Sequence, residues 1–460
     1  MTNAPQKTVA IIGGGLAGLA AGCALADSGC KVTLFERRPY VGGRASSYEH
    51  PGTGEVVDNC QHVLLGCCTN LIHFYEQLGV QEKIEWFDRL TFIEPGGRAS
   101  EIHPSWLPAP LHSMPSFFGA GFLSLTDKLA IGHALRAMMF SLPPDSQENF
   151  LAWLRRHHQT ERAIERFWKV VLVSALNEDL ERTSVHYAVQ VFRESFLKSA
   201  EAGRMGVPRI PLSDLYGAAI EYIARRGGQV LLRNSVSAIV PEANGIKVTT
   251  AAGERRFDQA VLAVPFQNAA ALLPSDGLAD PLKQKLEKFA ASPITGIHLW
   301  FDREITPLPH AVLLDRTIQW MFQKSRLHED RAAENTGSYL ELVVSASRSL
   351  VETARQEIID LALAELAEFF PAVKEAKLLK ATVIKEIFAT YSIAPGLNQF
   401  RPEAETQWPG IFLAGDWTAT GWPATMEGAI RSGYQAAEAI VQRNLISPDL
   451  KAKGLMRIFK

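Results

Sequence analysis

The stretch TVAIIGGGLAGLAAGCALADSGCKVTLFER, residues 8–37, decides the fold of this chain. A β-branched run leads into a cluster of glycines, small residues with helical spacing follow, and a second apolar run closes the stretch. This order predicts a strand, a tight turn, a helix and a second strand, which together make one βαβ unit. Gly13, Gly15 and Gly18 give the spacing GxGxxG where the first strand turns into the helix.

This spacing predicts a dinucleotide site. The first glycine permits the turn, the second lets the backbone approach a pyrophosphate, and the third lets the helix pack closely. Leu16 and Ala17 lie at the predicted helix N-terminus, where backbone N–H groups favour phosphate. Glu36 and Arg37 follow the second strand, and the Glu36 carboxylate suits a ribose 2′-hydroxyl but repels a 2′-phosphate. The stretch favours FAD or NAD over NADP, with a purely structural glycine turn as the alternative.

Composition excludes several classes of protein. Apolar residues make up 47% of the 460 residues and charged residues 21%, as in ordinary globular proteins. The 47 Lys and Arg residues nearly balance the 49 Asp and Glu residues, so we expect no nucleic-acid partner. No apolar run is long enough to span a membrane and no secretory signal is recognisable, so a cytoplasmic protein is expected. The five cysteines lack zinc-ligand spacing, so we expect reduced thiols and no metal: Cys23, Cys30, Cys60, Cys67 and Cys68.

A second glycine turn ends in Arg44, whose guanidinium suits a bidentate contact with phosphate. An ordinary surface arginine is the alternative interpretation. The stretch that holds it, LFERRPYVGGRASSY at residues 34–48, resembles a signature of the flavin-containing amine oxidase and carotenoid desaturase superfamily. The resemblance implies that Gly43 and Arg44 lie at the pyrophosphate of FAD, and it therefore favours FAD over NAD.

The segment GIFLAGDWTATGWPATMEGAIRSG, residues 410–433, resembles the closing FAD motif of the same superfamily. It implies that Gly415 and Asp416 lie at the pyrophosphate and ribityl chain. It also implies that the backbone of Ala424, Thr425 and Met426 reaches the isoalloxazine at the start of the last helix, where the helix dipole favours a negatively charged reduced flavin. Val236 matches a position that contacts the adenine in members of the superfamily.

Two features indicate which family within this superfamily the chain resembles. Amine oxidases usually carry an aromatic residue where Thr425 stands, and its absence argues against amine oxidation. The segment VVDNCQHVLLGCCTNLIHFYEQLG, residues 56–79, resembles the bacterial squalene-associated FAD enzymes, the hydroxysqualene dehydroxylases, although Cys60 replaces their usual glycine and Cys68 an aromatic residue. Membership of that family implies that reduced FAD removes the allylic hydroxyl of a C30 isoprenoid, hydroxysqualene, and leaves squalene, a hopanoid precursor.

Loss of an allylic hydroxyl as water requires a proton donor, a pocket that excludes other water molecules, and electron-rich groups that stabilise the developing cation. His62 is the expected donor, with Asp58 as its orienting partner, Cys60 as a second donor and Gln61 as an orienting group. Alternation along a strand would place Asp58, Cys60 and His62 on one face. The alternative is that these residues only hold a loop against the flavin. Trp417 and Trp422 are expected to line the substrate pocket with aromatic faces, and ordinary packing is the alternative.

The expected fold class is α/β: a Rossmann-type FAD-binding domain interleaved with a mixed-sheet and helical substrate domain, as in amine oxidases. The FAD-binding domain is expected to combine residues 1–80, 205–275 and 405–445, and the substrate domain residues 81–204 and 276–404. Residues 125–198 have helical patterns, residues 211–228 form an amphipathic helix, and strands are expected at 294–301, 317–322, 338–344 and 380–388.

Two segments predict peripheral contact with the inner face of the cytoplasmic membrane. Residues 106–122 mix aromatic residues with prolines and are expected to be irregular, and the tail at 446–460 alternates basic with apolar residues. A buried lid and a solvated tail are the alternatives. Two other functions stay open: oxidative desaturation of phytoene or a related polyene, and a prenyl-binding module without flavin chemistry. NADPH and an electron-donor protein are both candidate reductants of the flavin, and no oligomeric state is predicted.

Overall fold

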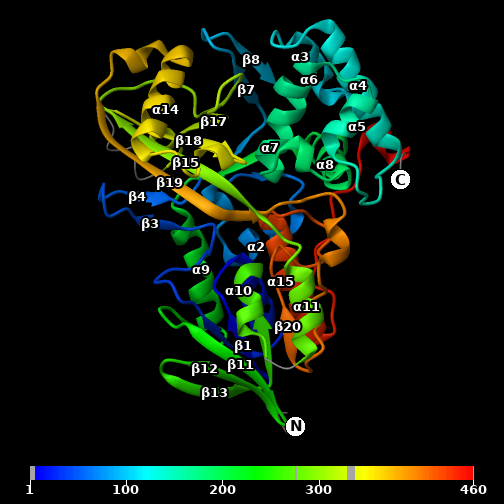
Figure 1. Ribbon diagram of the computed structural model, residues 1–460, viewed down its shortest axis with the longest axis vertical. Helices are drawn as coiled ribbons and strands as arrows, with labels where there is room; N and C mark the ends of the chain where they lie inside the picture. The colour runs from blue at the N-terminus through cyan, green and yellow to red at the C-terminus, as the bar shows by residue number, and fades with distance from the viewer. Residues whose placement is uncertain (1–5, 275–276, 329–336, 459–460) are drawn as a thin grey trace.

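A five-stranded parallel sheet forms the lower half of the molecule (Figure 1). The computed structural model describes residues 6–274, 277–328 and 337–458. The central strand β1 pairs with β2 on one side and with β14 on the other, so Ile12 lies between Phe35 and Leu262. The strands occur in the order β10 (Gln229–Leu231), β2 (Lys31–Phe35), β1 (Thr8–Ile12), β14 (Gln259–Leu262) and β20 (Ile411–Leu413). The predicted βαβ unit is confirmed, and three separated parts of the chain complete its sheet.

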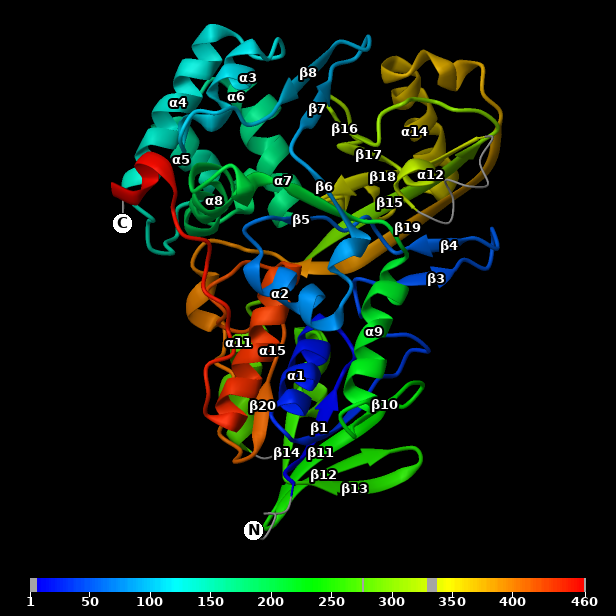
Figure 2. The ribbon, with the colours of Figure 1, turned by 180° about the vertical axis from the view of Figure 1, so that it is seen from behind.

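Three helices pack beside this sheet: α1 (Leu16–Asp27), α9 (Leu212–Ala224) and α15 (Met426–Val441). The first and last lie against each other (Figure 2). A Cβ atom at Gly433 of α15 would lie 2.2 Å from the carbonyl oxygen of Ala17, so only glycine permits this approach. The predicted helix at 211–228 is confirmed as α9, which ends before Gly227 turns the chain with a φ of +80°.

Short sheets surround the parallel sheet. An antiparallel meander of β11 (Val236–Glu242), β12 (Gly245–Thr250) and β13 (Gly253–Phe257) lies at the lower end (Figure 1). Near the middle, β3 (Ser47–Glu49) pairs with β4 (Val56–Asp58), and β9 (Met205–Pro208) pairs with β5 (Leu64–Leu65) and β6 (Ile84–Phe87). Helix α2 (Thr69–Leu78) lies between β5 and β6 in the chain, and α10 (Phe266–Leu272) and α11 (Asp280–Leu286) follow β14.

A seven-stranded mixed sheet forms one side of the upper half, with α14 (Arg355–Phe369) packed against β19. The four predicted strands are confirmed, and three further strands, β7, β8 and β16, extend the sheet. Sequence patterns missed them because each has only four residues, and the pairing of β7 with β16 joins distant parts of the chain. The order is β19 (Leu378–Tyr391), β15 (Ala291–Phe301), β18 (Ser338–Ser345), β17 (Trp320–Gln323), β16 (His310–Leu313), β7 (Leu90–Ile93) and β8 (Ala99–Ile102), and α12 (Lys324–Leu327) follows β17.

Helices form the other side of the upper half, and the predicted helical region is confirmed. Its main helices are α4 (Leu125–Phe140), α5 (Phe150–Arg156), α6 (Glu161–Ala163), α7 (Lys169–Leu176) and α8 (Val185–Val191). The prediction that residues 106–122 lack a helix is wrong, because α3 (Met114–Gly119) starts with Pro115 in its first turn, where a missing N–H costs nothing. In the described part of the chain no helix is both long and apolar enough to cross a bilayer.

Candidate functional site

One cavity of about 790 Å³ connects the two halves of the molecule. Its lower part is lined by residues at or just after the carboxyl ends of the parallel strands, among them Ile12, Glu36, Ala263 and Gly415. Ligands of open α/β sheets bind at this edge. The upper part is lined by the mixed sheet and by α7. A single cavity therefore adjoins both the predicted cofactor motifs and the upper half of the fold.

The glycine turn borders the lower part of this cavity. Gly13, Gly15, Leu16 and Ala17 line it, and a Cβ atom at Gly15 would have only Gly43 within 4 Å. The N-terminus of α1 therefore offers an open cradle for an anionic group. Gly18 does not line the cavity. A Cβ atom there would lie 2.0 Å from the Gly13 carbonyl oxygen, so Gly18 shapes the turn and does not contact a ligand.

Glu36 ties the glycine turn to the second strand. Its buried carboxylate accepts hydrogen bonds of 2.7 Å from the backbone N–H groups of Gly14 and Arg38. Each carboxylate oxygen has two lone pairs, so both can accept a further bond from a ribose hydroxyl. Glu36 and Arg37 both line the cavity. Their position fits the ribose site predicted from the sequence.

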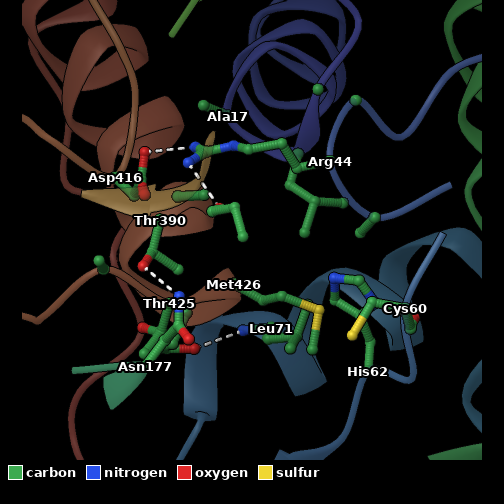
Figure 3. A pocket seen from close by; sticks show the side chains of 18 of the residues that line it. Ala17, Arg44, Cys60, His62, Leu71, Asn177, Thr390, Asp416, Thr425 and Met426 are labelled. Atoms are coloured by element: carbon green, nitrogen blue, oxygen red, sulfur yellow. Dashed lines mark hydrogen bonds and ion pairs between the residues drawn. The ribbon is translucent and has the colours of Figure 1, made fainter. Parts of the chain in front are cut away.

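Arg44 and Asp416 meet in the cavity, although they come from opposite ends of the chain (Figure 3). Arg44 Nη2 donates to Asp416 Oδ1 at 2.6 Å, and Arg44 Nη1 donates to the carbonyl oxygen of Ala389 at 3.1 Å. Gly43 approaches the first glycine turn so closely that a Cβ atom there would lie 2.9 Å from Gly15 Cα. The three predicted cofactor segments therefore share one site.

The closing motif lines the same cavity with Gly415, Ala424, Thr425 and Met426, and Val236 lines it further along. Thr425 caps α15, because its hydroxyl oxygen accepts a hydrogen bond of 3.1 Å from the Gly428 N–H. The positive end of the α15 dipole thus faces the cavity, as expected for a site that stabilises a reduced flavin.

The prediction for Trp417 is wrong. Only 1% of this residue is exposed, its indole Nε1 donates to the Val264 carbonyl oxygen at 3.0 Å, and it lies outside the cavity lining. The ring folds back over Gly415, where an added Cβ atom would lie 2.3 Å from the indole nitrogen. Trp422 does line the cavity, and the Arg431 guanidinium carbon lies 4.6 Å from its ring centroid.

The expected pairing of Asp58 with His62 is also wrong. Strand β4 ends at Asp58, so side chains no longer alternate through Cys60 and His62. Asp58 does not line the cavity, and its carboxylate accepts hydrogen bonds from Ser47 Oγ at 2.5 Å and from Lys324 Nζ at 2.7 Å. Lys324 and Ser47 hold the pKa of the Asp58 carboxyl below its usual value, against the opposing effect of burial. Asp58 therefore anchors the loop from behind.

Cys60, Gln61 and His62 do line the cavity. His62 Nδ1 lies 2.7 Å from the Cys60 carbonyl oxygen, which only accepts hydrogen bonds, so Nδ1 carries the hydrogen and Nε2 is left with a lone pair. Burial lowers the pKa of His62 and raises that of the Cys60 thiol well above its usual value. At neutral pH the imidazole is therefore uncharged and acts as an acceptor, which argues against His62 as the proton donor.

A buried charge cluster behind this loop was not predicted. Lys324 is 1% exposed, and its ammonium donates to Asp58 and, at 2.9 Å, to Gln61 Oε1. It also lies 3.4 Å from Glu341 Oε2, and burial raises the pKa of Glu341 to about 7. The cluster fixes the amide of Gln61, whose Nε2 donates to the His62 carbonyl oxygen at 3.0 Å. No local motif identifies Lys324 as part of this site, because two of its partners are far away in the sequence. Gln61 is 263 residues away and Asp58 is 266 residues away.

Arg401 is a second residue that the sequence did not reveal. Its buried guanidinium donates to the carbonyl oxygens of Trp422 at 2.7 Å and Asp416 at 2.9 Å, and to Thr420 Oγ1 at 2.9 Å. It thereby holds the closing motif in its path along the cavity. An isolated arginine carries no local signal for such a role.

The upper arm of the cavity is apolar. Its two polar side chains on the α7 side are occupied: Ser174 Oγ accepts from Trp320 Nε1 at 2.7 Å and donates to the Val170 carbonyl oxygen, and Asn177 Nδ2 donates to the Ser292 carbonyl oxygen and to Thr390 Oγ1. The arm therefore offers hydrocarbon surface to a ligand. Apolar residues that line it are Leu90, Phe92, Val170, Val171, Ala175, Val312 and Trp320.

Comparison with known proteins agrees with this site. The family profile of flavin containing amine oxidoreductases matches residues 16–441. The chain is 27% identical to the 15-cis-phytoene desaturase of Synechococcus elongatus, over 95% of this chain and 96% of that protein. Two solved structures share the fold at 18% identity: a triple mutant of putrescine oxidase has a TM-score of 0.73 and cyclohexylamine oxidase from Brevibacterium oxydans one of 0.68, each covering 95% of this chain and 99% of the other.

FAD fits the residues that line the lower cavity: an open glycine cradle at a helix N-terminus, a carboxylate with free lone pairs, a guanidinium and the capped start of α15. When bound, the flavin supplies two-electron chemistry at the junction with the apolar arm. The expected α/β architecture is confirmed as well. The chain belongs to the family of flavin containing amine oxidoreductases, and it is an FAD-dependent oxidoreductase.

Proposed function

We propose that this oxidoreductase removes the hydroxyl group of hydroxysqualene reductively and forms squalene. One observation carries the proposal: the segment that resembles hydroxysqualene dehydroxylases, with Cys60, Gln61 and His62, lies in the cavity that also adjoins the FAD motifs and an apolar arm. A C30 hydrocarbon chain fits the apolar arm, where the polar side chains on the α7 side, Ser174 and Asn177, are already hydrogen-bonded.

The chemistry follows from the allylic position of the hydroxyl. Protonation and loss of water leave a delocalised cation, and the carbon then takes hydride from the reduced flavin. The apolar arm excludes water that would recapture the cation. Trp422 offers an aromatic face to it, and the lone pair of His62 Nε2 suits an accepted hydrogen bond from the substrate hydroxyl.

The test is anaerobic incubation of photoreduced, FAD-loaded protein with hydroxysqualene in detergent. Flavin reoxidation is followed by absorbance and the products by gas chromatography with mass detection. We expect one squalene for each flavin reoxidised. Folded, flavin-loaded protein that forms no squalene would contradict the proposal, and protein that cannot be loaded with flavin would point to a prenyl-binding module. Repeating the reaction with NADPH in place of photoreduction tests whether NADPH or a protein donor reduces the flavin.

Oxidative desaturation of a polyene is the second candidate, and the similarity to 15-cis-phytoene desaturase favours it. The same cavity would then take hydride from the substrate instead of giving it. Incubation of the oxidised protein with phytoene distinguishes the two functions. Flavin reduction with formation of a longer polyene would support desaturation, whereas an unchanged flavin spectrum would oppose it.

Peripheral contact with the inner face of the cytoplasmic membrane is part of the proposal, because the substrate is a lipid. The tail and the 106–122 segment lie together, since the Leu455 N–H donates to the Ala109 carbonyl oxygen at 2.8 Å. Trp106 is 90% exposed, and Phe118 and Ile458 are also exposed. Phe459 and Lys460 lie outside the described residues. We expect Trp106→Ser with Ile458→Ser to weaken cosedimentation with anionic vesicles, and unchanged binding would contradict membrane contact here.

A further inference from the structure

In the part of the chain that the structure describes, five carboxylates line the cavity, and four of them have hydrogen-bond or ion-pair partners. Glu36 accepts from the backbone, and the other three form ion pairs: Glu194 with Lys198, Asp416 with Arg44, and Glu427 with Arg431. Glu386 is the fifth. Its backbone pairs with Ile294 in the sheet, but among the described residues its carboxylate has neither a hydrogen bond nor an ion pair, and the residue is half-buried. Its carboxyl group is therefore available to a ligand in the cavity.

A β-bulge places Glu386 at the cavity. Strands β15 and β19 pair Ser292 with Thr390 and then Ile294 with Glu386, so one residue of β15 faces three of β19 between these pairs. The single residue is Pro293, which cannot donate to the ladder. Bulges bend a strand and redirect side chains, and they are common beside active sites. Here the bulged residues Ile387 and Phe388 are 45% and 55% exposed, while Glu386, Ala389 and Thr390 line the cavity.

The surroundings of Glu386 place it between the cofactor motifs and the apolar arm. Ile294, its partner across the strands, lines the cavity, and Ala389 on the same strand accepts a hydrogen bond from Arg44. Burial raises the pKa of the Cys60 thiol, and the negative charges of Glu341, Asp58 and Glu386 raise it further, so the Glu386 carboxylate lies near the loop that carries His62. Glu386 therefore borders the region of the cavity where Arg44 of the cofactor site and the loop with Cys60 meet.

We infer that Glu386 is the acid that protonates the leaving hydroxyl group of the substrate. The inference rests on the proposed reductive function. The Glu386 carboxyl donates its proton to the hydroxyl oxygen, the C–O bond breaks with its electron pair on oxygen, and water leaves. The allylic cation then accepts hydride from the reduced flavin, which is oxidised, and the carboxylate regains a proton from solvent. The carboxylate left by the first step also offsets the positive charge of the cation.

Two neighbours are less suited to this step. His62 Nδ1–H is held by the Cys60 carbonyl oxygen, and the uncharged ring has no second proton. The Cys60 thiol is buried, and its raised pKa makes it a weak acid. The Glu386 carboxyl lines the cavity without a side-chain partner in the ranges that the structure describes, and a protonated carboxyl group is in general a stronger acid than a thiol or an imidazole. Glu386 thus has the chemistry that the step requires.

The test compares the wild-type holoenzyme with Glu386→Gln and, as a matched control, Glu55→Gln. Glu55 forms an ion pair of 2.6 Å with Lys380, on the exposed part of the same strand. Single-turnover reoxidation of photoreduced enzyme by hydroxysqualene is measured first. We expect Glu386→Gln to be about 100-fold slower or more, since general acids contribute on that order, and Glu55→Gln to match the wild type.

A second readout needs no turnover. A squalene analogue with an ammonium group in place of the reacting carbon mimics the cation, and its binding is followed through the spectrum of oxidised FAD. We expect Glu386→Gln to bind this analogue roughly tenfold more weakly, with squalene binding and FAD content unchanged. A Gln variant with wild-type turnover, or one that is slow but binds the ammonium analogue normally, would overturn the inference. If the wild type itself forms no squalene, the proposed function fails, and the ammonium comparison still decides whether Glu386 faces the bound chain.

Discussion

Arg44 Nη2 lies 2.6 Å from Asp416 Oδ1, and this ion pair joins two residues that are 372 positions apart in the chain. Arg44 comes from the loop after the first βαβ unit, and Asp416 follows the last strand of the parallel sheet. The pair therefore closes the cofactor site from both ends of the sequence, and its remaining guanidinium N–H groups are available to a phosphate.

Substitution of Arg44 by Met should weaken FAD binding. The change removes a donor for the pyrophosphate and leaves the Asp416 carboxylate close to it without a counter-charge, so the Kd for FAD should rise roughly 10- to 100-fold. Fluorescence titration of the apoprotein with FAD measures this. Arg326→Met removes a surface ion pair with Glu304 and serves as the control. Equal affinities for the three proteins would show that Arg44 does not contact the cofactor.

The cofactor half of this fold is readable from sequence because its signals are local. The GxGxxG turn, Glu36 and the GGR turn lie within 32 residues, and each needs its residue types for a backbone geometry or a charge. The closing motif is likewise continuous, from Gly415 to the Thr425 cap of α15. The prediction that Trp417 lines the pocket was wrong because the direction of its ring depends on tertiary packing, here against Gly415 and Val264.

The arrangement of the residues around the predicted substrate site depends on contacts between distant parts of the chain, which a single sequence does not show. Asp58 was expected to support His62, and it instead pairs with Lys324 at the start of α12, directly after β17. Glu386 has no motif around it and reaches the cavity through a bulge that depends on pairing with β15. Strands β7, β8 and β16 escaped prediction because each has only four residues, although the distant pairing of β7 with β16 joins them into one sheet.

Substitution of Lys324 by Met should destabilise the protein strongly. It leaves Asp58 and Glu341 buried without their shared counter-charge, a situation that costs about 3–5 kcal/mol of unfolding free energy. Urea unfolding followed by circular dichroism measures the loss. The variant that also carries Asp58→Asn and Glu341→Gln removes the unpaired charges and should recover most of it. A single variant as stable as the wild type would show that the cluster carries no net electrostatic stabilisation.

Glu341 should make stability depend on pH in the neutral range. Burial raises its pKa from 4.5 to about 7 in the folded protein, so the folded state holds this proton more tightly than the unfolded state does. The stabilisation is complete below about pH 4.5 and is lost as the pH rises towards 7, and its full size is on the order of 3 kcal/mol. Urea unfolding from pH 5 to 8 measures this effect. The unfolding free energy of the wild type, relative to that of Glu341→Gln, should decrease as the pH rises. A difference that is constant across this range would contradict the raised pKa.

Filling the apolar arm should block the substrate without affecting the cofactor. Ala175 lies on α7 beside Val171 in that arm, away from the glycine turns, so Ala175→Trp adds volume where the hydrocarbon chain is expected. The purified variant should keep its full FAD content and flavin spectrum, while single-turnover reoxidation by hydroxysqualene should fall by about 100-fold or more, because the chain no longer reaches the flavin in a reactive position. Ala175→Ser, which changes volume little, is the control. Wild-type turnover by the Trp variant would mean that the substrate chain lies elsewhere, whereas loss of FAD would mean that the arm and the cofactor site are not separate.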